Sequence, residues 1–369
     1  MLKFSEVLND SIEAGKQSSS YRNYLYVRKR VIRIIDEMQL HNNHLPSDYW
    51  EEELSGLDYM LDASPLIIRK LREHCHHITG IRAYEYRGHH SHRQNAFAQK
   101  LALLRQQDEV GLFVPESPLL GGFGHKIDDA IVNLDTLKFY ECLIALQNAG
   151  LLNDLLENKN RKKIILEIGA GWGGFPYQIK TLFSNVAYVI IDLPQVLLLS
   201  AVYLKTLFPS ASVFIYGDNP IENLWNNPKA YDFIFLPHYI VDNFQIDDIY
   251  LTVNLASFQE MTTAQVDMYV RKAAKLKCPH LYSLNRDRSP HNTQLTTVSS
   301  IIGKYYNSKE IKVLDSAYVD LSKSSKSKAS KNKPFTKQSL AFLRGKKKEK
   351  VRKRSTHKYR HLVGTLSIS

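Results

Sequence analysis

The sequence predicts an α/β protein with a doubly wound, Rossmann-like sheet and a helical N-terminal region. One observation is the apolar run 164–168, which glycines follow at once, as in a buried parallel strand that ends in a tight turn. A second is the alternation of short apolar runs with helix-like segments beyond residue 174. A third is Asp192, an acid that closes the next apolar run and therefore falls at a strand end.

The elements of this sheet domain follow one another in a regular order. Pro176 lies in the first turn of the first helix, where its missing N–H costs little. A last apolar segment, 361–366, has strand character and would complete the sheet. We expect helices at 175–183, 195–208 and 263–277, and strands at 164–168, 189–191, 212–216, 231–236, 248–254 and 280–284.

We expect residues 1–150 to form a mostly helical N-terminal region and residues 151–369 to form the sheet domain. Apolar side chains recur at helical spacing within 23–38, and Ser64-Pro65 begins a second helix that runs through Cys75. The segment 115–124 is dense in Pro and Gly yet apolar. That composition suits either a lid over a bound cofactor or a loop that connects the two regions.

The turn after the first strand predicts a nucleotide-type cofactor site, because glycines allow close backbone approach and a helix N-terminus follows. Its E-x-G-x-G-x-G form favours S-adenosylmethionine over a dinucleotide, since Glu167 suits a cationic methionine end and repels a pyrophosphate. Asp192 can accept both ribose hydroxyls. A turn that serves strand–helix packing alone is the alternative. The predicted cofactor-binding residues are Glu167, Gly169, Gly171, Gly173, Asp192 and Asp218.

The positive charge of the chain is concentrated in one segment. The net charge is +12, yet 16 Lys or Arg and one acid lie between Lys323 and Arg360. The remaining 33 basic and 36 acidic residues leave the rest of the chain at −3. We therefore interpret 322–356 as a basic, disordered insertion before the last strand, with weak electrostatic contact to phosphate-rich partners as its expected effect.

Other features bear on the cellular compartment and on metals. The three cysteines lie far apart without a CxxC pair, which suits a reducing compartment and indicates neither disulfides nor zinc. The histidines at 74–77 and 89–92 lack carboxylates at ligand spacing, so we predict no metal site. The N-terminus lacks a signal-peptide core, and no apolar run approaches the roughly 20 residues that span a bilayer. We expect a cytoplasmic protein without a transmembrane segment.

Functional groups in such sheets gather at the carboxyl ends of strands. Of the many polar residues in the chain, this rule selects a few as candidates for acid–base chemistry. The residues it selects are Asp218, His238, Asn254, Gln259, Glu260, Asn285 and Arg286.

Several motifs together resemble the sugar O-methyltransferase family found among bacterial surface-polysaccharide genes, within the class I S-adenosylmethionine-dependent methyltransferase superfamily. The resemblance covers roughly residues 50–315 and the last strand. The glycine motif is generic to the superfamily, whereas Gly-Gly-Phe-Gly at 121–124 and Ser-Phe-Gln-Glu-Met at 257–261 are more specific. The motifs lie at 58–66, 78–80, 120–124, 133–141, 167–174, 192–194, 257–261 and 282–285.

The resemblance implies methyl transfer from S-adenosylmethionine to a hydroxyl of a sugar or glycan acceptor. Such a hydroxyl is a poor nucleophile at neutral pH, so a general base within hydrogen-bond reach is expected. Glu260 follows the strand that faces the reacting methyl in these folds, and we favour it narrowly over His238. The structural alternatives are a helix-capping acid for Glu260 and a loop histidine for His238.

Two other functions remain open at the level of sequence. The cofactor site together with the basic segment would suit an RNA methyltransferase, although the Asn/Asp-Pro-Pro-Tyr motif of many base N-methylases is absent. A non-catalytic binding protein of the same fold is the other alternative. An intact Glu167, glycine turn and Asp192 weigh against it.

Overall fold

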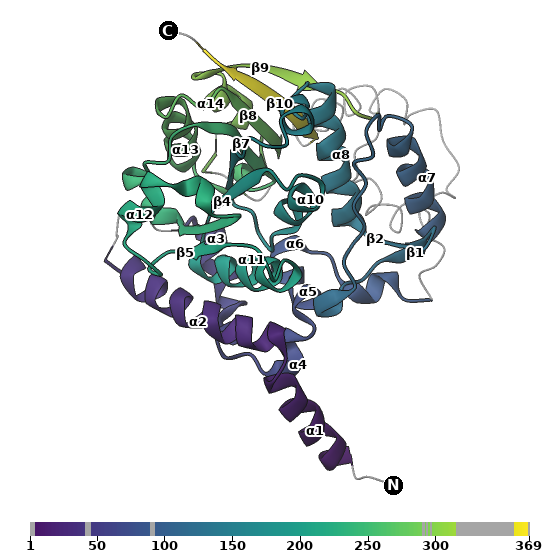
Figure 1. Cartoon of the computed structure of the whole chain (residues 1–369). Coiled ribbons are helices and arrows are strands. Elements are labelled where there is room, and N and C mark those ends of the chain that lie inside the picture. Colours follow the sequence, from purple (N-terminus) through teal and green to yellow (C-terminus); the bar gives the residue numbers. More distant parts are fainter. Residues whose placement is uncertain are drawn as a thin grey trace, which may run out of the picture.

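The computed structural model describes residues 4–40, 46–88, 93–289, 292, 294–295, 297–314 and 358–367. Its centre is an eight-stranded sheet (Figure 1). The strands are β3 (Lys163–Ile168), β4 (Val186–Asp192), β5 (Val213–Ile215), β6 (Phe233–Pro237), β7 (Ile249–Leu255), β8 (His280–Arg286), β9 (Tyr306–Ile311) and β10 (Tyr359–Leu366). Their order is β5-β6-β4-β3-β7-β8-β10-β9, with β10 antiparallel to both neighbours and the pairs from β5 to β8 parallel.

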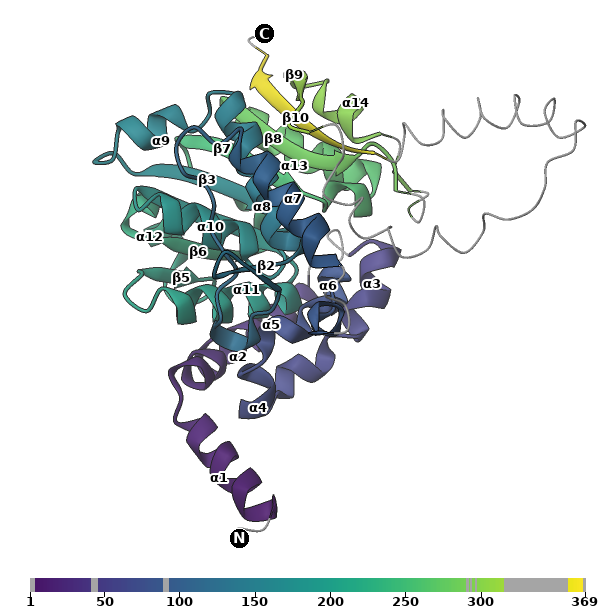
Figure 2. The same cartoon turned by 90° about the vertical axis from the view of Figure 1, so that its right-hand side faces the viewer.

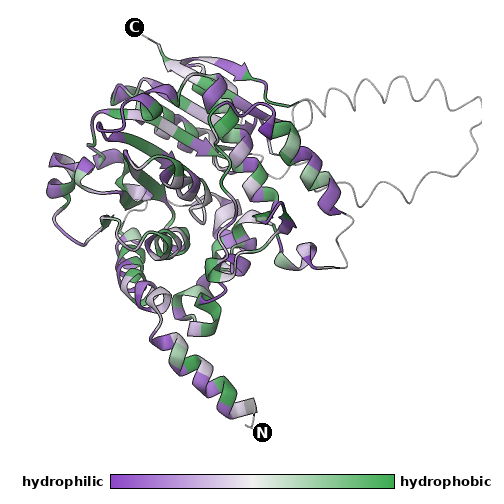
Figure 3. Ribbon diagram, turned by 45° about the vertical axis from the view of Figure 1, so that its right-hand side comes forward, coloured by the Kyte–Doolittle hydropathy of each residue, from purple (hydrophilic) through white to green (hydrophobic). Residues whose placement is uncertain are grey.

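The central strands are buried on both faces, as their continuous apolar runs predict. All seven residues of β4 are buried, and alternate side chains enter two separate cores. Tyr188 and Ile190 join one core, whereas Val189 and Ile191 join the other. Hydropathy colouring shows these strands as the hydrophobic centre of the molecule (Figure 3).

Helices cover both faces of the sheet, which confirms the doubly wound α/β architecture (Figure 2). One face carries α2 (Ser19–Met38), α8 (Leu134–Asn148), α10 (Gly174–Leu182) and α11 (Pro194–Leu207). The other carries α12 (Ile221–Asn226), α13 (Thr263–Lys275) and α14 (Val298–Ile302). The apolar stripe of α2, built from Tyr24, Val27, Val31 and Ile34, is buried as its spacing predicts.

The N-terminal region is mostly helical, and α1 extends away from the body of the molecule (Figures 1 and 2). The continuous helix expected from Ser64 through Cys75 is wrong, because the backbone leaves helical geometry at Lys70 (φ −116°, ψ 24°). A short hairpin of β1 (His125–Ile127) and β2 (Ala130–Val132) follows the Pro- and Gly-rich segment. The helices are α1 (Phe4–Lys16), α3 (Asp48–Ser55), α4 (Pro65–Ile68), α5 (Leu71–His74), α6 (His76–Thr79) and α7 (Gln94–Arg105), with α9 (Asn153–Glu157) before β3.

The predicted last strand is confirmed as β10, which lies between β8 and β9. Its His361 is held by the Tyr282 hydroxyl at 2.7 Å and by Glu141 of α8 at 3.1 Å, so the strand is fastened to sheet and helix. The basic insertion predicted at 322–356 lies outside the described residues.

The described residues also bear on the metal, cysteine and membrane expectations. They contain no group of three or more His, Cys, Asp or Glu placed to hold a metal ion. The three cysteines are free and buried. Within the same residues, every helix is too short or too polar to cross a membrane.

Candidate active site

A cavity of about 450 Å³ opens at the carboxyl ends of β3 and β7. The two strands are neighbours, yet α10 follows β3 on one face of the sheet and α13 follows β7 on the other. The side on which the connecting helix lies therefore changes between β3 and β7. Open α/β sheets bind their ligands at such a switch point. Gly169 marks the junction, because a Cβ there would lie 2.2 Å from Ser257 Oγ of the neighbouring loop.

Glu167 and Asp192 place two buried carboxyl groups in the wall of this cavity, at 1% and 8% exposure. Burial raises the pKa of Glu167 to about 8, although the Tyr188 hydroxyl donates to its carboxylate at 2.8 Å. Burial likewise raises the pKa of Asp192 to about 7, against the hydrogen bonds that backbone N–H groups donate to it. A cation or hydroxyl donors in the cavity would stabilise the ionised form of both groups.

Two glycines of the turn have different structural roles. Gly171 lines the cavity at φ +61°, and its N–H donates to Asp192 Oδ2 at 2.9 Å. The nearest atom to a Cβ there would be Ile78 Cδ1, at 3.6 Å, which is ordinary van der Waals contact and no clash. Gly173 lies outside the cavity lining, and a Cβ there would meet Leu204 and Ser200 of α11 at 3.2 Å. Gly173 thus serves helix packing, and its predicted cofactor contact has no support in this geometry.

Glu260 and His238 both line the same cavity, although they come from different loops. Burial raises the pKa of the Glu260 carboxyl to about 8, partly opposed by a hydrogen bond with the Gln259 side chain and by the charges of Arg286 and Lys138. Thr262 caps α13 and accepts from Gln265 N–H, so Glu260 is not needed as the helix cap. His238 begins the turn after β6 and is 8% exposed.

A chain of buried amides fixes the loop that carries Glu260. Asn254 donates to Ile168 O at 2.7 Å and accepts from Phe258 N–H at 2.9 Å, which joins the ends of β3 and β7. Asn285 donates to Asn254 Oδ1 at 2.8 Å and accepts from Gln259 N–H at 3.2 Å. The segment from β7 to α13 is therefore held from both sides of the switch point.

Asp218 is not brought to the cavity. Its carboxylate accepts a hydrogen bond from the Tyr26 hydroxyl at 2.8 Å and forms an ion pair with Arg30, both from α2. The strand-end rule selects it, but β6 separates β5 from β4, so the end of β5 lies two strands from Asp192. Asp218 therefore fastens α2 to the sheet.

Several cavity residues escape the strand-end rule because they come from the N-terminal region or from the last strand. Lys138 of α8 lies 2.7 Å from Asp135 Oδ1, and this i, i+3 acid–base pair on an expected helix is a signal that could have identified it. Ser47 donates to the Glu260 carbonyl at 2.9 Å and ties the N-terminal region to the site. The aromatic members of the lining include Trp50, Tyr86, Phe139, Trp172, Tyr269 and Tyr359.

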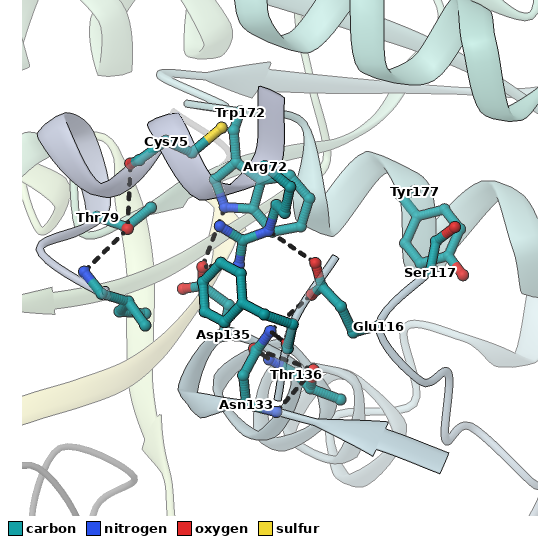
Figure 4. Close-up of polar contacts among 12 residues, drawn as sticks. Arg72, Cys75, Thr79, Glu116, Ser117, Asn133, Asp135, Thr136, Trp172 and Tyr177 are labelled. Atoms are coloured by element: carbon teal, nitrogen blue, oxygen red, sulfur yellow. Dashed lines mark hydrogen bonds and ion pairs between the residues drawn. The ribbon is translucent and has the colours of Figure 1, made fainter. Parts of the chain in front are cut away.

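A buried charge cluster centred on Arg72 adjoins the glycine turn through Trp172 (Figure 4). Its guanidinium pairs with Glu116 and Asp135 at 2.8 Å each and stacks on the Trp172 ring at 3.8 Å. Trp172 in turn donates to Asp135 Oδ2 at 3.1 Å. Glu116 belongs to the segment 115–124, none of whose residues lines the cavity, and its ion pair with Arg72 anchors this loop.

No family model matches the chain, and no curated protein does. Among solved structures, it is similar to phosphoethanolamine N-methyltransferase 2 of Haemonchus contortus in complex with S-adenosyl-L-methionine. The two share 11% identity over 64% of this chain and 60% of that one, with a TM-score of 0.33. It is also similar to a Synechocystis magnesium protoporphyrin IX methyltransferase with bound SAM, at 8% identity over 75% of this chain and 95% of that one, with a TM-score of 0.34.

A third likeness, to the mitomycin 7-O-methyltransferase MmcR, has 14% identity over 39% of this chain and 36% of that one, with a TM-score of 0.24. The chain spans 60% of the Haemonchus contortus structure, which is less than two thirds of its length. Likeness at these identities concerns the fold alone. The assignment of a cofactor and an acceptor therefore rests on the residues of the cavity.

Proposed function

We propose that the chain is an S-adenosylmethionine-dependent O-methyltransferase that acts on a sugar hydroxyl of a surface glycan or its precursor. The observation that carries the proposal is the convergence of Glu167, Asp192 and the glycine turn with Glu260 in one cavity. The first set suits the cofactor and the last residue suits acid–base chemistry on the acceptor.

The cofactor half of the cavity fits S-adenosylmethionine. Glu167 would hold the cationic methionine end, and Asp192 would accept the ribose hydroxyls, which restores the ionised form of both buried groups. The glycine backbone at Gly171 allows close approach of the ligand. A pyrophosphate in the same place would be repelled by the ionised form of both carboxyl groups, which the cationic cofactor instead stabilises.

The acceptor half combines aromatic faces with polar groups, a lining that suits a sugar ring. Trp50 and Tyr359 supply apolar surface, and Glu260 lies among them as the proposed base. The bound cofactor supplies an activated methyl group on a sulfonium. Glu260 would take the proton of the acceptor hydroxyl as the hydroxyl oxygen forms a bond to the methyl carbon, while the bond from that carbon to sulfur would break and release S-adenosylhomocysteine. The surrounding walls would exclude water and align the reacting atoms.

Two measurements test the function. Mass spectrometry of surface glycans should show methylated sugars that disappear when the gene is deleted and return with the intact gene. Transfer of a labelled methyl group from S-adenosylmethionine to extracted glycans, and not to RNA, should occur with purified protein. Transfer to RNA with unchanged glycans would replace this proposal by the RNA-directed one.

The cofactor assignment predicts selective binding. The protein should bind S-adenosylhomocysteine with a Kd on the order of micromolar, and NAD much more weakly, in titration calorimetry. Gly171→Val should abolish this binding, because the new side chain would project toward the cavity from a backbone with φ +61°. The far-ultraviolet circular dichroism of the variant should stay close to that of the wild type. NAD binding without a response to S-adenosylhomocysteine would contradict the assignment.

The pKa of Glu167 predicts how cofactor affinity depends on pH. The cationic end of the cofactor prefers the carboxylate, which forms as the pH rises through about 8. Affinity for S-adenosylhomocysteine should therefore increase with pH up to about 8, by at most roughly tenfold per pH unit, and then level off. Calorimetry in buffers of different ionisation enthalpy should detect proton release on binding. Glu167→Gln should remove this part of the pH dependence, and an unchanged profile would count against the assigned contact.

A further inference from the structure

Three basic side chains line the cavity, and they differ in how their charge is balanced. Lys138 lies 2.7 Å from Asp135, and Arg93 lies 2.9 Å from Glu85. Arg286 makes no ion pair with any residue in the part of the chain that the structure describes. Its Nε is also buried without a hydrogen-bond partner there. Arg286 therefore has no acidic partner within 4 Å among those residues, and its charge reaches the Glu260 carboxyl of the same cavity only from beyond that distance.

Arg286 is nevertheless held in place, and the groups that contact it are neutral. It ends β8, and its backbone N–H donates to Gln259 Oε1 at 3.0 Å. The guanidinium lies over the Tyr359 ring, 4.6 Å from the ring centre. Gln259 also donates to the Tyr359 hydroxyl at 3.1 Å. The same glutamine precedes Glu260, so Arg286 and the proposed base share one rigid support.

A half-buried guanidinium that forms no ion pair and has an unpaired Nε is costly, and an incoming oxyanion would offset that cost. Arginine presents its N–H groups as a planar fork that matches a carboxylate or a phosphate. We infer that the acceptor carries an oxyanionic group, as in a sugar acid or a sugar phosphate, and that Arg286 binds it. This inference rests on the proposed function and narrows its acceptor class. In this position Arg286 would orient the sugar so that its hydroxyl faces Glu260.

The test uses the full-length protein saturated with S-adenosylhomocysteine, after binding of that cofactor product has been confirmed. Inorganic phosphate and acetate serve as minimal anions, and glucose 1-phosphate and glucuronate are compared with neutral glucose. Binding is followed by ligand NMR and calorimetry at constant ionic strength. Phosphate-type or carboxylate-type probes should bind at least about tenfold more tightly than glucose, as expected for a charged hydrogen bond. Preference for one type identifies the source of the oxyanion.

Arg286→Gln should abolish this preference and leave the affinity for S-adenosylhomocysteine unchanged. Arg286→Lys should retain part of it, because the charge stays while the fork is lost. Arg271→Gln removes an exposed arginine of α13 that is outside the cavity lining, and it should behave like the wild type. Equal anion binding by wild type and Arg286→Gln would overturn the inference while cofactor binding upholds the function.

A different outcome would reassign the residue. If Arg286→Gln weakens S-adenosylhomocysteine binding at least about tenfold and anion binding persists, Arg286 serves the cofactor carboxylate and the inference fails. Absence of S-adenosylhomocysteine binding by the wild type would instead defeat the proposed function itself. The two failures are therefore distinguished before any sugar is added.

Discussion

Glu260→Gln is expected to lower kcat for methyl transfer roughly a hundredfold or more, with little change in cofactor affinity. Glutamine keeps the shape of the side chain but cannot take a proton from the acceptor hydroxyl. The loss should therefore appear in the chemical step, measured in single turnovers at saturating cofactor. The wild-type rate should rise with pH through about 8, because burial raises the pKa of Glu260 to that value and the base must be ionised.

His238→Asn is the matched comparison, because His238 lines the same cavity and is the other candidate base. It should lower kcat less than Glu260→Gln does. The reverse ranking would assign the proton to His238 and leave Glu260 to position the acceptor. If neither change slows the chemical step, alignment of the reactants alone drives the reaction and the choice of Glu260 as base is wrong.

The sheet could be predicted because its strands are buried on both faces. Such strands are continuous apolar runs, and β3 and β4 stand out against the lysines and glycines beside them. The final strand, β10, was predictable for the same reason, since its apolar residues follow a long basic segment. The hairpin of β1 and β2 was not, because its strands have three residues each and carry little pattern.

Site residues could be predicted where their position depends only on the end of a strand. They could not be predicted where it depends on the order of the strands in the sheet. Glu167 is the second-last residue of β3 and Asp192 the last residue of the neighbouring β4, and both line the cavity. Asp218 also follows a strand, but the position of β6 between β4 and β5 is a long-range pairing that local sequence does not encode. Lys138 and Tyr359 reach the cavity from a helix and from the last strand, through tertiary packing alone.

The buried cluster around Arg72 anchors the segment 115–124 through Glu116. Its Pro and Gly content marks a loop, but nothing in the sequence reveals that Glu116 would pair with an arginine 44 positions earlier. Asn133 donates to the same Glu116 carboxylate at 2.8 Å. Asp135 forms ion pairs with Arg72 and Lys138 and accepts a hydrogen bond from the Trp172 indole. The cluster therefore joins α5, the loop, α8 and the glycine turn.

Arg72→Gln is accordingly expected to destabilise the protein by about 3–5 kcal/mol, because it leaves the buried Glu116 and Asp135 without their shared cation. Urea unfolding followed by circular dichroism measures the loss. Affinity for S-adenosylhomocysteine should fall as well, since Trp172 stacks on Arg72 and lines the cavity. Arg72→Lys should be less damaging to stability, because one charge remains, but it cannot bridge both acids.

Arg105→Gln is the control for Arg72→Gln, because Arg105 also pairs with an aspartate at 2.7 Å, yet 42% of its side chain and 68% of that of Asp128 are exposed. An exposed pair of this kind contributes about 1 kcal/mol or less. The two substitutions thus remove the same group from an ion pair and differ in burial. Equal losses of stability would show that burial of the Arg72 cluster does not determine its contribution. A loss confined to Arg72→Gln, together with weaker cofactor binding, would show that the cluster holds the glycine turn in place.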